Sequence, residues 1–170
     1  MTVVVSDTGP LLHLHQVGAE HLLAHLGHVQ VPPAVWRELQ RLAPGFTVNR
    51  MPEWLSESQL SASASLQARQ WVSARILHAG EAEALACAWE IQAAMFLTDD
   101  TAARTLGESL GIQVRGSLGV ILHAAACGHL DQTTCLQLLD GLEKRSTLWM
   151  SAKVKAAARQ AAVRIFANPG

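Results

Sequence analysis

The chain has 170 residues, of which 49% are hydrophobic and 16% are charged, and its formal net charge is −1 at pH 7. This length suits one domain with a well-developed core, and we expect residues 1–170 to form a single domain. A near-neutral charge excludes a strongly basic nucleic-acid-binding surface spread over the whole chain. Because no apolar run is long enough to span a bilayer and no signal-peptide pattern opens the sequence, we expect a cytoplasmic protein with no membrane partner.

Strand and helix patterns alternate along most of the sequence. Short apolar runs predict strands, in chain order, at 3–5, 29–31, 94–97 and 112–114. Apolar residues at helical spacing and strong helix formers predict helices at 11–26, 34–39 and beyond, 65–77, 80–90, 101–110, 117–126, 132–142 and 151–166. The stretch 43–68 loosens into one long connection, in which Trp54 and Leu55 predict a strand or an anchored loop.

This alternation predicts an α/β fold with a parallel sheet and helices on both of its faces. Right-handed crossovers place the C-terminal ends of parallel strands at one edge of the sheet. In open sheets of this kind, ligands bind in the crevice outside those strand ends. The helices from about residue 132 onward follow the last predicted strand, so we expect them to be appended to the core.

Aspartates stand directly after two of the predicted strands. Asp7 follows the run Val3–Val5, and Asp99 and Asp100 follow the strand at 94–97. Taken alone, an aspartate at this position is also a common cap of the following helix. Two such junctions would bring their carboxylates to the same edge of the sheet.

Glutamates stand near the starts of two predicted helices. Glu38 lies one or two turns into the helix that begins at 34, and Glu81 and Glu83 lie in the first turn of the helix at 80–90. Two residues apart on a helix, Glu81 and Glu83 project about 200° from each other, so only one can face a given site. The periodicity leaves open which of them does. Exposed helical acids are the ordinary alternative, and under it the protein is purely structural.

A cluster of carboxylates without nearby basic residues is electrostatically unstable, and hard divalent cations relieve the repulsion. Mg²⁺ or Mn²⁺ bound at such a site can activate water and stabilise charge on a phosphoryl oxygen. The sequence lacks a nucleophile-elbow serine motif, a Walker A loop and a dinucleotide-binding glycine motif. The eight histidines and three cysteines lack the spacing of a zinc site.

Several short motifs occur in a characteristic order along the chain. They are Ser6–Leu11 (SDTGPL), Pro32–Val35 with Glu38 after it, Gly80–Ala84 (GEAEA), Leu97–Asp100 (LTDD), Gly116–Val120 (GSLGV) and Leu148–Ser151 (LWMS). Together they resemble the PIN-domain family, and most closely its prokaryotic branch DUF3368. The resemblance covers almost the whole chain.

The resemblance implies a PIN-like three-layer α/β/α sandwich with a central, mostly parallel sheet. It further implies a Mg²⁺- or Mn²⁺-dependent endoribonuclease that hydrolyses RNA phosphodiester bonds. Members of this family are often the toxin of a toxin–antitoxin pair, so it implies a cognate antitoxin partner and a homodimer.

Carried over by position, the resemblance assigns catalytic roles to Asp7, Glu38, Glu81, Glu83 and Asp100. Of these, it assigns metal binding to Asp7, Glu83 and Asp100. The third acid falls on Glu81 or Glu83, and the fourth on Asp100 by its Thr-x-Asp pattern or on Asp99 by spacing. Thr8 or Ser6 is expected to hold the first carboxylate. Because PIN nucleases commonly have aspartate at the third position, the alternative is a catalytically degenerate module that binds nucleic acid or protein.

Basic residues dominate the end of the sequence. From Gly141 onward they are Lys144, Arg145, Lys153, Lys155, Arg159 and Arg164, against Glu143 alone. Such a tail can meet a phosphate backbone, although a solvated helix face gives the same pattern.

Overall fold

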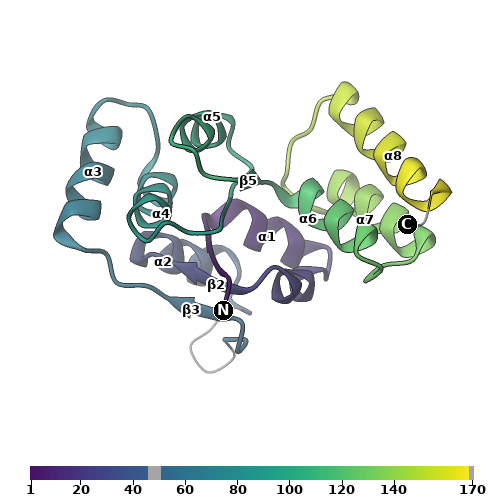
Figure 1. The fold of residues 1–170 in the computed structure, drawn as a ribbon, viewed down its shortest axis with the longest axis horizontal. Coiled ribbons are helices and arrows are strands. Elements are labelled where there is room, and N and C mark those ends of the chain that lie inside the picture. Colours follow the sequence, from purple (N-terminus) through teal and green to yellow (C-terminus); the bar gives the residue numbers. More distant parts are fainter. Residues whose placement is uncertain (46–50, 169–170) are drawn as a thin grey trace.

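The fold is seen in a computed structural model of the chain, which describes residues 1–45 and 51–168 (Figure 1). The strands are β1 (Val3–Ser6), β2 (His28–Val31), β3 (Leu55–Glu57), β4 (Met95–Leu97) and β5 (Val114–Arg115). The helices are α1 (Thr8–Gln16), the 3₁₀ helix η1 (Glu20–His25), α2 (Pro33–Leu42), α3 (Ala62–Ser73), α4 (Ala79–Glu90), α5 (Thr101–Ser109), α6 (Ser117–Ala126), α7 (Gln132–Arg145) and α8 (Ala152–Ala167).

The strands form one five-stranded sheet in the order β3-β2-β1-β4-β5, and each pairing is parallel. The β1 strand lies at the centre, where Val5 pairs with Gln30 of β2 on one side and with Phe96 of β4 on the other. A strand enclosed by neighbours and covered by helices is buried on both faces, which explains its uninterrupted valines. The predicted α/β sandwich is therefore confirmed.

The chain leaves β1 in one direction along the sheet and later returns to its other side. It first adds β2 and β3, and then adds β4 and β5 beyond the opposite edge of β1. The strand order therefore reverses between β1 and β4, where the Asp7 N–H donates to the Leu97 carbonyl over 3.0 Å. In open parallel sheets such a reversal leaves a crevice at the C-terminal ends of the two strands.

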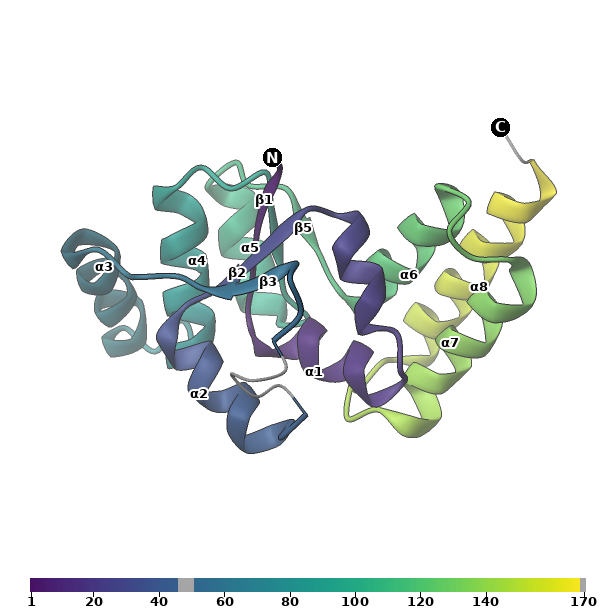
Figure 2. The ribbon, with the colours of Figure 1, turned by 90° about the horizontal axis from the view of Figure 1, so that it is seen from below.

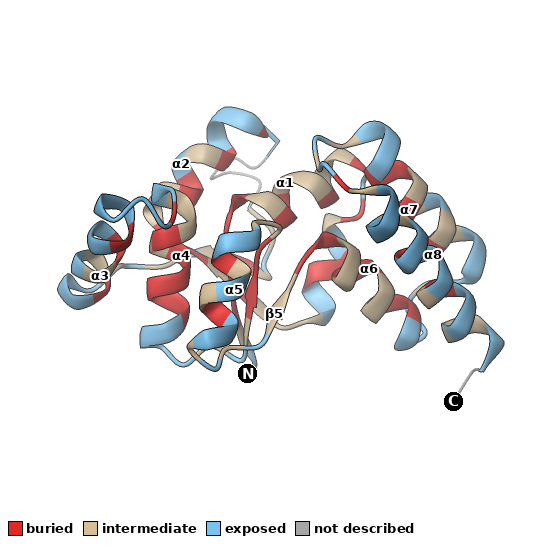
Figure 3. Cartoon of the chain, turned by 90° about the horizontal axis from the view of Figure 1, so that it is seen from above, coloured by how far each residue is buried: buried red, intermediate tan, exposed pale blue. Residues whose placement is uncertain are grey.

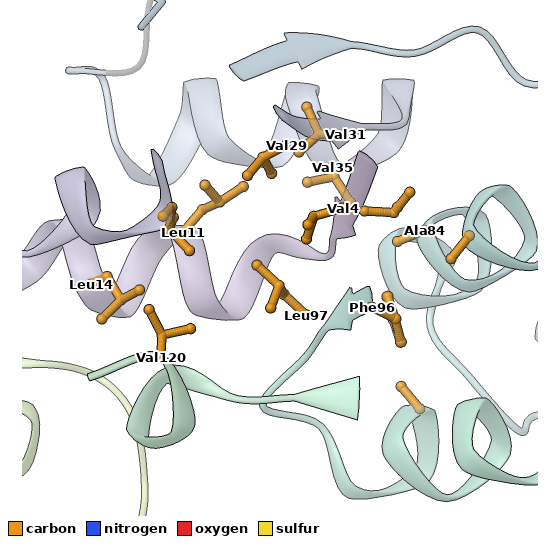
Figure 4. Packing of buried hydrophobic residues seen from close by; sticks show 14 of the residues in the cluster. Val4, Leu11, Leu14, Val29, Val31, Val35, Ala84, Phe96, Leu97 and Val120 are labelled. Carbon is orange, nitrogen blue, oxygen red and sulfur yellow. The ribbon is translucent and has the colours of Figure 1, made fainter. Parts of the chain in front are cut away.

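The core lies between the central strands and the helices that cover them (Figure 4). Val4, Leu11 and Phe96 are completely buried within it. Helix α4 is buried over much of its length (Figure 3) and packs against β1, β4 and α3. Its buried side chains are mostly small, namely Ala82, Ala84, Leu85, Ala86, Cys87 and Ala88. Small side chains allow the helix backbone to lie close to the sheet.

The last three helices gather at one end of the molecule (Figure 2). They pack on one another, and α6 and α7 also contact α1. Salt bridges between α7 and α8 join Asp140 to Arg159 over 3.0 Å and Glu143 to Lys155 over 2.9 Å. Lys144 also pairs with Asp140, over 2.9 Å. Much of the basic tail is therefore neutralised within the fold.

The predicted helix over 11–26 is wrong in its extent. Helix α1 ends at Gln16, and the chain then turns through Gly18, whose φ of +71° favours glycine, before η1 begins. The predicted helix at 65–77 begins and ends earlier, as α3. The connection at 43–68 contains β3, and its residues 46–50 lie outside the described part of the chain.

Within residues 1–45 and 51–168, none of the helices combines the length and apolar composition that crossing a membrane requires.

Replacing the central core residue Phe96 with alanine should lower the free energy of unfolding by about 3–5 kcal/mol, because it leaves a cavity between β4 and the helices that cover it. Urea unfolding followed by circular dichroism measures this change. Leu66→Ala is the matched control, since Leu66 is 52% exposed and its truncation should cost less than about 0.5 kcal/mol. Equal losses for the two variants would contradict the packing described above.

Candidate active site

A cavity of about 440 Å³ opens at the C-terminal ends of β1 and β4, where the strand order reverses. The acids that line it are Asp7, Glu38, Glu81, Asp99 and Asp100. They come from the ends of two strands and from the helices α2 and α4. Its wall also contains His13 and the segment Thr147–Trp149, which connects α7 to α8. The expected convergence of strand-end aspartates at one edge of the sheet is therefore observed.

Asp7 is the most buried of these acids, at 3% exposed. It caps α1, because its Oδ1 accepts the Gly9 N–H over 3.0 Å, and its Oδ2 accepts a short hydrogen bond from the Thr98 hydroxyl. Burial raises the pKa of Asp7 well above its ordinary value of 3.8, and repulsion from Asp99 and Glu81 raises this pKa further. The hydrogen bonds from Thr98 and Gly9 oppose that increase.

Two glutamates face the cavity from helices. The Thr8 hydroxyl donates to Glu38 Oε2 over 2.5 Å, so α1 orients a side chain of α2. Glu81 reaches back to the start of its own helix, where its Oε2 accepts the His78 N–H over 2.9 Å. Partial burial and repulsion from Asp100 raise the pKa of Glu81 above its ordinary value of 4.5. Gly80 leaves room between them, since a Cβ atom there would lie 3.2 Å from Glu38 Oε2.

Glu83 does not line this cavity. Its Oε2 instead accepts the Ala34 N–H over 2.8 Å, at the start of α2. That helix begins with Pro33, and none of its own side chains caps its N-terminus. The Glu83 carboxylate therefore accepts one of the free backbone N–H groups there, and its negative charge interacts favourably with the positive end of the helix dipole. Because Glu81 and Glu83 project from different sides of α4, Glu81 lines the cavity, whereas Glu83 binds the start of α2.

The paired aspartates after β4 also differ. Asp99 accepts the Ser117 N–H over 2.7 Å and the Ser117 hydroxyl over 2.5 Å, and its Oδ2 lies 2.7 Å from His13 Nδ1. It therefore links the end of β4 to α1 and α6. Asp100 caps α5 through Oδ1, which accepts the Ala103 N–H over 2.7 Å. In the described chain no hydrogen bond engages its Oδ2.

The donor chemistry of the cavity suits a hard divalent cation. Several carboxylates face it, and among its described lining residues there is no lysine or arginine to neutralise them. Burial is the main cause of the raised pKa values of Asp7 and Glu81, and repulsion from neighbouring acids raises both further. Within the described residues, however, no three acidic, histidine or cysteine side chains stand close enough together to form a ready-made metal site. Asp7, Glu81 and Asp100 are the residues that would hold Mg²⁺ or Mn²⁺ there.

Several side chains that organise the site were not expected from the sequence. We expected Thr8 or Ser6 to hold Asp7, but Thr98 holds it, while the Ser6 hydroxyl donates to the Asp7 carbonyl over 2.8 Å. His13 and Ser117 were likewise missed as partners of Asp99. The sequence does place His13 in the helix that Asp7 caps, which brings it near the C-terminal end of β1, but nothing local identifies Asp99 as its partner. The Ser117 contact spans 18 residues and depends on the fold.

Comparison with known proteins agrees with this architecture. The family model described as "DUF3368: PIN domain" matches residues 3–164. A comparison with curated proteins gives no match. This family match suggests a fold of the nuclease type, and the all-parallel sheet described above is consistent with it. The chain belongs to the PIN-domain family, whose members are generally nucleases.

The raised pKa of Asp7 predicts a specific dependence of stability on pH in metal-free buffer. The folded state holds the Asp7 proton more tightly than the unfolded chain does. The contribution of Asp7 to the free energy of unfolding is therefore fully present below about pH 3.8, and it is lost as the pH rises through the pKa of Asp7 in the folded state. The Asp7→Asn variant has no carboxyl group to ionise at this position, so it does not lose this stability. Relative to the wild type, its unfolding temperature should therefore rise between pH 4 and 7, by about 2–4 °C for each kcal/mol of the difference.

Thermal unfolding followed by circular dichroism across this pH range, with EDTA present, measures the difference. The control is Asp131→Asn, because Asp131 is an exposed cap of α7 whose pKa is lowered by the Thr134 N–H. Its stability should therefore fall relative to the wild type as the pH rises. A constant difference between Asp7→Asn and the wild type would show that Asp7 is not held in an unfavourable charged state.

Proposed function

We propose that this protein is a Mg²⁺- or Mn²⁺-dependent endoribonuclease that hydrolyses RNA phosphodiester bonds in the acid-lined cavity. The observation that carries the proposal is the gathering of Asp7, Glu38, Glu81 and Asp100 around one cavity at the strand reversal of a PIN-domain chain. Perturbed carboxylates in a cleft are typical of catalytic sites.

Asp7, Glu81 and Asp100 form the metal-binding set in this proposal. Asp7 and Glu81 repel each other, and so do Glu81 and Asp100, so each of these pairs lies within electrostatic range. Asp100 keeps one carboxylate oxygen outside its helix cap, whereas Asp99 spends both of its oxygens on Ser117 and His13. Glu81 replaces Glu83 as the third acid because Glu83 is bound to the start of α2.

When bound, the cation would supply charge stabilisation for the phosphoryl oxygens and would acidify a water molecule. The chain's own residues fix where this happens. Thr98 and Gly9 hold Asp7 in one orientation, so its carboxylate needs little rearrangement. Glu38, oriented by Thr8, faces the same cavity from α2 and is placed to accept a proton from the attacking water.

A catalytically degenerate binding module is the second candidate. The observation that favours it is the lack, within the described residues, of three metal-binding side chains close enough together to hold an ion. Under this reading the family's fold is kept and its chemistry is lost. Measurements of metal binding and RNA cleavage on the same variants separate the two candidates.

As part of the proposal, the enzyme is a cytoplasmic toxin that forms a homodimer and is restrained by a cognate antitoxin protein. The family resemblance supports this role. Exposed apolar side chains on α3 and α4 also support a protein partner, since Leu66, Val72 and Trp89 are 52%, 40% and 47% exposed.

Asp7→Asn and Glu81→Gln should each bind Mn²⁺ more weakly and cleave RNA at least about 100-fold more slowly than the wild type. Each substitution removes a ligand charge, and the bound cation contributes several kcal/mol to the transition state. Calorimetric titration of Mn²⁺ and cleavage of a fluorescent RNA measure the two effects, with circular dichroism to confirm folding.

The matched control is Glu83→Gln, two residues away on the same helix, whose amide oxygen can still accept the Ala34 N–H. It should retain metal binding and cleavage close to those of the wild type. Metal binding without cleavage in the wild type would favour the degenerate module. Equal losses for Glu81→Gln and Glu83→Gln would remove the assignment of the third acid.

Expression of the wild type in bacteria without its antitoxin should arrest growth, whereas expression of Asp7→Asn should not. Sedimentation of the purified chain should give twice the mass of one chain. Growth arrest by both proteins would disconnect the toxic effect from the acid-lined cavity.

A further inference from the structure

A second cavity, of about 650 Å³, lies beside the acid-lined one. It is bounded by α5, the turn between β5 and α6, and the segment from Leu148 to Ser151 that leads into α8. The two cavities share Asp99, Asp100, Leu148 and Trp149 in their walls. An RNA chain bound across the acid-lined cavity can therefore continue directly into the second cavity.

Trp149 stands on the rim that the two cavities share, and its side chain is 83% exposed. The segment that carries it is fixed on both sides. Before it, the Thr147 N–H and hydroxyl donate to Gln16 Oε1 over 2.8 and 3.1 Å. After it, Met150 is buried and Ser151 caps α8. A fixed segment thus presents a large, bare indole face beside the acids.

Two arginines line the second cavity, and they differ in what they can reach. Arg115 Nη1 is shielded from solvent, and the electrostatic neighbours of the Arg115 guanidinium are Cys127 and His123, which do not line this cavity. Arg104 makes one long hydrogen bond, of 3.4 Å, to the Thr98 carbonyl, and lies 3.9 Å from Glu108. A guanidinium without a firm carboxylate partner is a natural ligand for phosphate.

Glycines make room for both guanidinium-bearing side chains. A Cβ atom on Gly116 would lie 3.0 Å from Arg104 Nη2, and one on Gly119 would lie 2.6 Å from Arg115 Cγ. The basic tail, in contrast, spends Lys144, Lys155 and Arg159 on ion pairs with α7. Among the described lining residues of the second cavity, the cation best placed to meet a phosphate beside the acids is therefore Arg104.

We propose that the second cavity is a nucleotide subsite, in which an unpaired base stacks on Trp149 and the adjoining backbone phosphate binds Arg104. The inference rests on the proposed ribonuclease function and adds to it the residues that select the strand. Stacking on an aromatic side chain requires a free base face, which bases inside a duplex do not offer. The subsite therefore selects single-stranded RNA next to the bond that is cut.

The test is binding of a fluorescein-labelled hexauridylate to the full chain in EDTA, where fluorescence anisotropy reports affinity without metal-dependent cleavage. Trp149→Ala should weaken binding by about 5- to 150-fold, the range for losing one stacked base, and Trp149→Phe should retain most of the affinity. Binding to a blunt RNA duplex should not change. Circular dichroism should show that each variant is folded.

Arg104→Gln should weaken binding and reduce the slope of log K against log salt concentration by about 0.7, as expected for one lost contact with a single-stranded phosphate. The matched control is Trp89→Ala, because Trp89 is 47% exposed but lines a different cavity, on α4. Its affinity for the hexauridylate should equal that of the wild type.

Unchanged hexauridylate affinity in Trp149→Ala would overturn the subsite, and so would equal losses for Trp149→Ala and Trp89→Ala. Failure of the wild type to bind hexauridylate would overturn it as well. Because cleavage is measured separately with Mn²⁺, an enzyme that cuts RNA while Trp149→Ala binds normally retains the proposed function and loses only the subsite. If hexauridylate binding depends on Trp149 but the protein cleaves no RNA, the subsite is retained and the proposed ribonuclease function is lost.

Discussion

The hydrogen bond from the Thr98 hydroxyl to the Asp7 carboxylate is the interaction on which the rest of this edge of the sheet depends. It joins the ends of β1 and β4, the neighbouring strands between which the chain reverses its order. Asp7 also caps α1, and Thr98 Oγ1 accepts the Asp100 N–H over 3.1 Å at the start of α5. One contact thus sets two strand ends, two helix starts and the spacing of their acids.

This arrangement keeps a buried carboxylate where a neutral side chain would be less costly. Burial and two neighbouring acids raise the pKa of Asp7, and its two hydrogen bonds offset only part of that cost. A protein without a use for the charge could fill the position with a threonine or serine cap. The repulsion is concentrated at the one edge of the sheet where a parallel fold places its ligand crevice, which is a functional pattern more than a structural one.

The sequence predicts well the features that depend on neighbouring residues. The valines of β1 followed by Asp7, and β4 followed by Asp99 and Asp100, identify the strand ends and hence their shared edge. The choice between Glu81 and Glu83 is different, because it depends on which face of α4 packs on the sheet. Glu83 finds its partner 49 residues away, at Ala34, and no local pattern reports such a contact. The end of α1, in contrast, is determined locally, but the sequence indicates it only weakly, through the single glycine Gly18.

The two adjacent aspartates after β4 show how one short motif can serve both architecture and chemistry. Asp99 is fully engaged by Ser117 and His13, and a Cβ atom on Gly116 would lie 2.6 Å from its Oδ1, so the turn into α6 closes around it. Side chains of successive residues diverge, so Asp100 leaves that contact and faces the cavity with Glu81 as its electrostatic neighbour. Fixing Asp99 therefore also fixes the backbone from which Asp100 projects. Under the proposed function, an acid held in this way loses little conformational entropy when it binds an ion.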